Sequence, residues 1–157
     1  MLRLAGRESD GAVLNWLAPS DVATVTPHVH QAGPGREIAA RIFVAATGDL
    51  EQARALGRRA LAAYLNVPVY KAFHQWLGRG ERLAPMWAAW ERGDRRGALA
   101  ALGDDVVDEL LVHGPPEACR ERLAEYAEAG VHTPILAVLP VGGDIRDSVR
   151  ALAPAAG

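Results

Sequence analysis

The stretch Asp10–Asp21, DGAVLNWLAPSD, decides the fold of this 157-residue chain. Its apolar run Gly11–Leu14 predicts a strand that is buried on both faces, as strands of parallel sheets usually are. The residues Pro19–Asp21 follow directly and are typical of a helix start. A strand that leads into a helix in this way normally has a strand on each side, so other segments of the chain must pair with it.

Two further segments predict strands, and each is followed by a helical pattern. They are IAARIFVAA at Ile38–Ala46 and TPILAVLPV at Thr133–Val141. The region between them from Pro68 to Gly114 shows short helical patterns and no strand signal. Strands that alternate with helices indicate right-handed βαβ units and a parallel sheet. We therefore expect an α/β fold of about three parallel strands in chain order, in one domain over residues 1–157, with a helical insertion at about 68–114 before the last strand.

Composition and charge narrow the class of protein. Half of the residues are apolar and 23% are charged, and 17 basic and 19 acidic residues leave a net charge of -2. This balance does not favour nucleic acid or an anionic membrane as partner. The single cysteine, Cys119, allows no intramolecular disulfide, which suits a reducing compartment. No apolar run approaches the ~20 residues of a membrane helix, and the first ten residues show no signal-peptide pattern. We expect a cytoplasmic protein that binds neither nucleic acid nor membranes.

Two long motifs resemble the luciferase-like monooxygenases, and in particular their deazaflavin (F420)-dependent oxidoreductase branch. Residues 1–22, MLRLAGRESDGAVLNWLAPSDV, are similar to a helix P-x-M-L-R-L-A-G that leads into a strand A-D-G-A-x-L-N-W. Residues 112–140, VHGPPEACRERLAEYAEAGVHTPILAVLP, are similar to the closing section G-T-P-E-E-C-R-E-R-L followed by A-G-V-x-T-P-x-L. The stretch between these motifs follows the same order of elements.

The resemblance implies part of a (β/α)8 TIM barrel, a fold that takes roughly 250 residues when complete. The chain resembles the C-terminal half: the end of the fifth helix, then strands six, seven and eight. The resemblance also implies a flavin- or F420-dependent oxidoreductase or monooxygenase, with F420 or FMN as cofactor and a small-molecule substrate. The family's cofactor contacts come mostly from the strands without a counterpart here. We therefore expect the chain alone to be incomplete as a catalyst and to bind either cofactor poorly or not at all. The alternative is a non-catalytic truncated barrel that forms a stable homo-oligomer.

Candidate cofactor contacts lie where the predicted strands end, because chemistry in such barrels sits at the carboxyl ends of the strands. Asn15 could hydrogen-bond a cofactor, Trp16 could form a wall of its pocket, and Thr47 follows the second strand. Each has a structural alternative: Asn15 caps its own loop, Trp16 packs in the interior, and Thr47 caps the next helix. No catalytic residue is assigned.

Other residues that suggest chemistry give weaker signals. His28 and His30 do not share a helix face, and no Asp, Glu or Cys at ligand spacing joins them, so no metal site is predicted. Cys119 is either a thiol activated by nearby arginines or, as we favour, a buried structural residue. Arg41 lies inside the second predicted strand, where it must face a polar lumen, pair with a carboxylate or reach solvent.

The two outer predicted strands bear on assembly. Ala12–Trp16 and Thr133–Leu139 should form the edges of the sheet, and natural proteins cover exposed edges. A symmetric dimer is the commonest closed assembly. We therefore expect a homodimer whose contact includes the first or the third strand.

Overall fold

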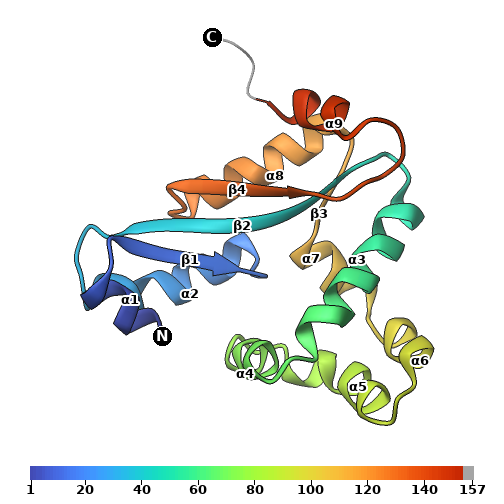
Figure 1. The fold of residues 1–157 in the computed structure, drawn as a ribbon, viewed down its shortest axis with the longest axis horizontal. Helices are drawn as coiled ribbons and strands as arrows, with labels where there is room; N and C mark the ends of the chain where they lie inside the picture. The colour runs from blue at the N-terminus through green and yellow to red at the C-terminus, as the bar shows by residue number, and fades with distance from the viewer. Residues whose placement is uncertain (154–157) are drawn as a thin grey trace. The chain divides into compact units, whose positions relative to one another are not determined.

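The computed structural model describes residues 1–153, and the last four residues of the predicted domain lie outside this part (Figure 1). The chain forms two compact units. Unit 1 combines Met1–Gly48 with Leu110–Gly157, and unit 2 is Asp49–Glu109. None of the helices within residues 1–153 is long and apolar enough to cross a membrane.

Unit 1 contains a parallel sheet with β2 at its centre (Figure 1). Val44 of β2 pairs with Val112 of β3 and also with Val138 of β4, so β3 and β4 lie on opposite sides of β2. β1 pairs with the first half of β2 on the side away from β4, so β1 and β3 follow one another along the same side. The strands are β1 (Gly11–Asn15), β2 (Glu37–Ala46), β3 (Val112–Gly114) and β4 (Thr133–Val138).

The predicted α/β fold with a parallel sheet is confirmed, and the structure adds the strand β3. The expectation that residues 68–114 hold no strand is therefore wrong at their end. β3 has only three residues, which is too short for an alternating or continuous apolar pattern to stand out in the sequence. It forms because its backbone completes hydrogen bonds beside the second half of β2.

One face of the sheet is buried beneath helices, and the other is open at its margins. Alternate residues of β2 from Ile38 to Val44 are at most 2% exposed, because successive side chains of a strand point to opposite faces. On the other face, Val13 of β1 is 71% exposed and Ile135 of β4 is 43% exposed. The helices of unit 1 are α1 (Leu2–Glu8), α2 (Pro19–His30), α8 (Pro116–Glu128) and α9 (Ile145–Leu152).

Local sequence explains how α2 and α8 are held. α2 begins at Pro19, which suits a first turn, and the Asp21 carboxylate accepts a hydrogen bond of 2.7 Å from the Ala18 N–H. Pro27 lies within α2, which continues past it to His30. α8 is tied to the segment after β1 by the buried Tyr126 hydroxyl, which donates to the Leu17 carbonyl at 2.9 Å.

Unit 2 consists of helices. The Asp49 carboxylate accepts from the Gln52 N–H at 2.9 Å, so the N-cap of α3 is Asp49 and not Thr47, the cap considered from the sequence. The buried Trp87 indole donates to the Leu65 carbonyl at 2.8 Å and so ties α5 to the end of α3. The helices are α3 (Leu50–Leu65), α4 (Pro68–Trp76), α5 (Gly80–Glu91), α6 (Arg95–Ala100) and α7 (Asp104–Leu110), whose last residue belongs to unit 1.

The acidic helix α7 is held by arginines within unit 2. Arg79 contacts Glu109 at 2.5 Å, and Arg82 contacts the same carboxylate at 2.9 Å. Burial alone would raise the pKa of Glu109, but hydrogen bonds and charges from Arg79 and Arg82 outweigh it, and the pKa is lowered. Further ion pairs join Arg54 to Asp104 and Asp108, Arg58 to Asp104, and Arg82 to Asp105.

Candidate functional site

The end of β1 has an unusual backbone that places Trp16. Trp16 has a φ of 53°, the only positive φ of a non-glycine residue within residues 1–153. This left-handed conformation costs an L-residue roughly 1–2 kcal/mol. The turn stacks the indole on the Phe43 ring of β2, with 3.7 Å between centroids and 7° between planes. Trp16 is only 1% exposed, so its indole packs in the interior, which is the structural role considered for it from the sequence.

Arg41 completes an aromatic stack that the sequence did not predict. Its guanidinium carbon lies 4.5 Å from the centroid of the Phe43 ring. Since the Trp16 indole lies against one side of that ring, the guanidinium lies over the other. Such a contact is attractive because the ring face is electron-rich. Arg41 makes no ion pair within residues 1–153. The expectation that it pairs with a carboxylate is therefore excluded for this part of the chain.

Asn15 and Arg41 are neighbours across β1 and β2. The register pairs them directly, and directly paired residues of adjacent strands point to the same face. Both are half-buried. Val13 and Ile135 lie on this same face, because Val13 is two residues before Asn15 and Ile135 pairs with Arg41. The open face therefore presents an amide and a guanidinium beside two exposed apolar side chains.

Thr47 is not part of this group. It directly follows β2, where its N–H donates to the Ala45 carbonyl at 2.9 Å and its backbone bridges Gly114. Asn15 pairs with Arg41, which lies six residues before Thr47 in the chain. At about 3.3 Å per residue, Thr47 is therefore roughly 20 Å from Asn15 along the strand. The three predicted contact residues thus divide into an adjacent pair and one distant residue. Phe43 was missed, although its spacing of two from Arg41 placed both on one face.

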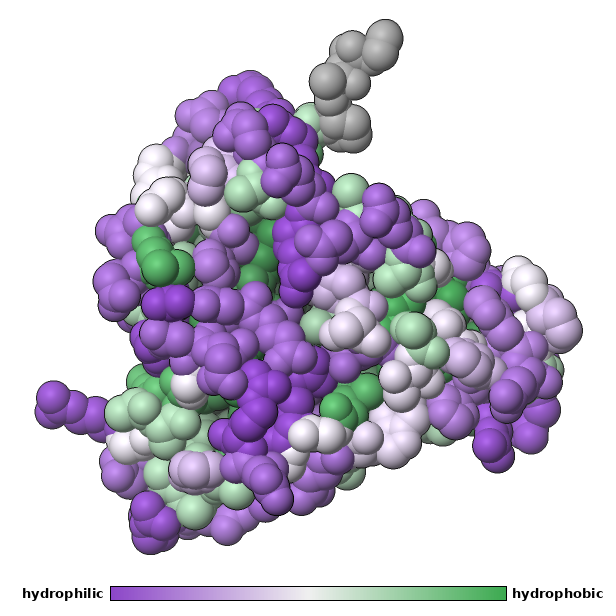
Figure 2. Space-filling view, turned by 180° about the vertical axis from the view of Figure 1, so that it is seen from behind, coloured by the Kyte–Doolittle hydropathy of each residue, from purple (hydrophilic) through white to green (hydrophobic). Residues whose placement is uncertain are grey.

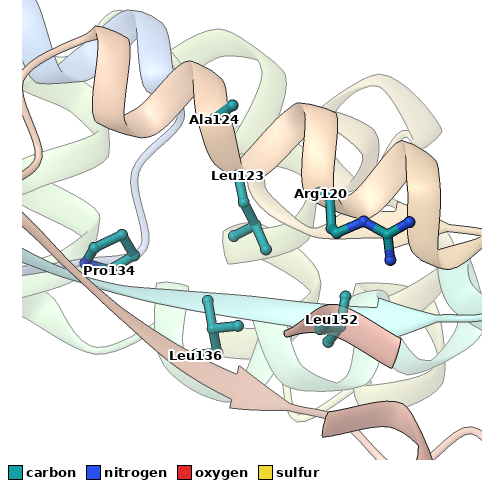
Figure 3. Close-up of a pocket in the computed structure, with 6 residues that line it drawn as sticks. All are labelled: Arg120, Leu123, Ala124, Pro134, Leu136 and Leu152. Atoms are coloured by element: carbon teal, nitrogen blue, oxygen red, sulfur yellow. The ribbon is translucent and has the colours of Figure 1, made fainter. Parts of the chain in front are cut away.

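An apolar pocket of about 460 Å³ lies elsewhere in unit 1, among α8, β4 and α9 (Figure 3). Leu136 of β4 belongs to the face opposite Ile135, so this pocket opens on the helix-covered side of the sheet and is separate from Asn15 and Arg41. The Arg120 guanidinium at its border donates to the Ala151 carbonyl. The lining residues are Arg120, Leu123, Ala124, Pro134, Leu136 and Leu152.

Cys119 supports the structural interpretation. Its side chain is buried, and Sγ lies 3.4 Å from the Gly114 carbonyl. Burial raises the pKa of the thiol to about 11, an effect that the nearby Arg120 charge only partly offsets. A thiolate, which is the reactive form, is therefore scarce at neutral pH. Within residues 1–153 no group of three or more His, Cys, Asp or Glu side chains could hold a metal ion.

The open face carries groups that suit binding, and His113 of β3 belongs to the same face because it pairs with Ala45, two residues after Phe43. Val13 and Ile135 offer a flat apolar surface, and Asn15 and Arg41 offer hydrogen-bond donors, with a positive charge that suits an anionic group. These residues fit one wall of a site for a flat ligand that carries an anion. A pocket that encloses such a ligand needs further walls.

Comparison with known proteins agrees with the two sequence motifs. Residues 1–133 match the family model of the luciferase-like monooxygenases. The 5,10-methylenetetrahydromethanopterin reductase of Archaeoglobus fulgidus is 26% identical over 96% of this chain and 48% of its own length. The chain thus spans about half the length of this curated relative.

Two solved structures share the fold. The coenzyme F420-dependent tetrahydromethanopterin reductase from Methanopyrus kandleri superposes with a TM-score of 0.75 at 21% identity, over 97% of this chain and 46% of that one. An F420-dependent secondary alcohol dehydrogenase, in complex with an F420-acetone adduct, gives a TM-score of 0.61 at 18% identity, over 98% and 46%. The resemblance predicted from the motifs is confirmed, and the chain belongs to the luciferase-like monooxygenase family.

Proposed function

We propose that the chain forms the C-terminal part of an F420-dependent oxidoreductase that acts on a small molecule in the cytoplasm. The observation that carries the proposal is the match of nearly the whole chain to one half of proteins described as F420-dependent. The open face of the sheet supports it, because that face supplies one wall of a binding site and leaves the other walls to further polypeptide. FMN is the alternative cofactor.

Asn15 and Arg41 are the residues that would hold the cofactor. Their side chains are adjacent on the open face, and Arg41 is fixed against Phe43 rather than against a carboxylate. A bound deazaflavin supplies the hydride chemistry, while the protein binds and orients it. Asn15 donates or accepts one hydrogen bond, Arg41 attracts the anionic part, and Val13 and Ile135 exclude water from one side of a flat ring.

Titration of the isotope-labelled chain with F420, followed by amide NMR shifts, tests the proposal. One wall of a site should bind weakly, and we expect a dissociation constant of about 1 mM, which corresponds to about -4 kcal/mol. The shifts should cluster at Asn15, Trp16 and Arg41. Arg41→Ala should reduce them severalfold, whereas Arg146→Ala, which removes the same charge from an exposed site on α9, should not.

The outcomes of this titration are distinct. Shifts that cluster elsewhere, or none at several millimolar, would contradict the proposed site. A stronger response to FMN than to F420 would assign the chain to an FMN-dependent branch. Micromolar affinity would refute the expectation that the chain alone is incomplete.

A second candidate function is a non-catalytic truncated barrel that persists as a homo-oligomer. The observation that favours it is β4, whose first four residues are all exposed, so that a covering partner would stabilise the fold without any cofactor. An assembled species that shows no shift with either cofactor at several millimolar would support this second function over the first.

A further inference from the structure

β4 is exposed in a way that one covering layer cannot correct. Ile135 is 43% exposed and Leu136 is 37% exposed. Consecutive residues of a strand point to opposite faces, so apolar surface is open on both sides of β4. A partner that stacked on one face would leave the other open. A strand added to the free edge, with its own side chains and helices, would cover both.

The chain offers one edge that matches β4. β1 pairs with β2 and with no other strand of the described residues, so no strand covers its outer edge. It has five residues against six in β4, and both run parallel to β2. Val13 of β1 is 71% exposed, on the same face as Ile135. The two edges are therefore similar in length, equal in direction and apolar on a shared face.

The helix side of β4 also lacks apolar cover. α9 exposes Ile145 by 49% and Val149 by 52%, four residues apart and hence on one helix face. Only Leu152 at the end of this stripe is buried, where it lines the pocket beside Leu136 (Figure 3). Hydrophobic residues also reach the surface at several places in the space-filling view (Figure 2). In unit 1 they include Ile135 and Leu136 of β4 and Ile145 and Val149 of α9.

We propose that two copies of this chain join edge to edge, with β4 of each copy parallel to β1 of the other. A twofold axis along the strands creates two identical seams and leaves neither edge free, as closed symmetry requires. Pro134 has no N–H to donate to this seam, and apolar contacts of Val13, Ile135 and Leu136 add to the remaining backbone hydrogen bonds. The inference rests on the proposed function in one respect: the second copy would contribute the walls of the cofactor site that one copy lacks.

The mass of the chain in solution tests the assembly. Light scattering after size exclusion should give twice 16.7 kDa at micromolar concentration. Ile135→Glu places a charge within both seams and should raise the dimer dissociation constant at least about 100-fold. Val69→Glu is the matched control, because Val69 is 65% exposed in unit 2, and it should remain dimeric. Unchanged circular dichroism shows that each variant folds. A monomeric wild type, or a dimeric Ile135→Glu, would overturn the proposal.

Disulfide trapping then identifies the seam. A Val13→Cys chain is mixed with a tagged chain that carries Cys at 133, 135 or 137, the residues of β4 on the same face. Neighbouring strands bring side chains within disulfide reach, so one of the three mixtures should give a heterodimeric disulfide. Dominant self-linking of the β4 variants would indicate antiparallel β4 pairs, and self-linking of Val13→Cys would indicate face-to-face sheets; either result refutes the proposed seam. The F420 titration depends on Arg41 and not on the seam, so the proposed function and the proposed dimer can each be refuted without the other.

Discussion

Removal of the Tyr126 hydroxyl should destabilise unit 1 measurably. This hydroxyl donates a hydrogen bond of 2.9 Å to the Leu17 carbonyl and so ties α8 to the segment that follows β1. Both residues are buried, at 1% and 3% exposure. Tyr126→Phe keeps the ring and its packing but leaves the carbonyl without that donor and without access to water.

The magnitude follows from the burial of the acceptor. A buried polar group that loses its partner costs about 1–3 kcal/mol, so we expect the free energy of unfolding to fall by about 1.5 kcal/mol. With a urea dependence of about 2 kcal/mol per molar, the unfolding midpoint should fall by about 0.7 M. The cost is not larger, because the phenyl ring fills the same space and no cavity opens.

Urea unfolding followed by far-ultraviolet circular dichroism measures this change. Tyr70→Phe is the control, since it removes a hydroxyl from a half-buried ring that solvent reaches, and its midpoint should move by less than about 0.2 M. Equal midpoints for Tyr126→Phe and the wild type would refute the reasoning. They would show that the Leu17 carbonyl gains another donor or that α8 moves to admit water.

Two further outcomes follow from the titratable groups. Glu109→Gln should lower the free energy of unfolding at pH 7 by about 1–2 kcal/mol, since Arg79 and Arg82 lose a charged acceptor. The pKa of Glu109 is lowered in the folded state, so its contribution to the free energy of unfolding is present above the unfolded pKa of about 4.3 and is lost as the pH falls through the folded value. The difference in free energy of unfolding between variant and wild type should therefore shrink below about pH 4.5. A constant difference from pH 7 to pH 3 would contradict the ion pairs. Cys119, whose pKa is raised to about 11, should react with Ellman's reagent at pH 8 at least about 100-fold more slowly in the folded chain than in urea, and equal rates would show that the thiol is accessible.

The sequence predicted the long strands because their signals are local. Ile38–Ala46 was recognised from its apolar run, and the structure extends this strand by one residue to Glu37. The last predicted strand ends at Val138 rather than Val141, because apolar residues continue past the point where pairing with β2 stops. β3 could not be predicted, since three residues carry no periodic pattern and pair only once β2 is in place.

The candidate site was predicted in part for the same reason. Asn15 and Trp16 were found because they end a recognisable strand. The stack of Arg41, Phe43 and Trp16 depends on the register between β1 and β2 and on the left-handed turn at Trp16. Local sequence propensity predicts neither the register between two strands nor a positive φ at a non-glycine residue.

The bridge between Thr47 and Gly114 has a consequence for how such chains can diversify. The chain leaves the sheet after Thr47 and returns to it at Val112, the first residue of β3. Because β2 and β3 are parallel, any segment in place of unit 2 must carry the chain back from the end of β2 to the start of β3, which takes about a dozen residues or more. The helices of unit 2 can therefore become longer or shorter, or be replaced by others, without a change in the sheet that positions Asn15 and Arg41.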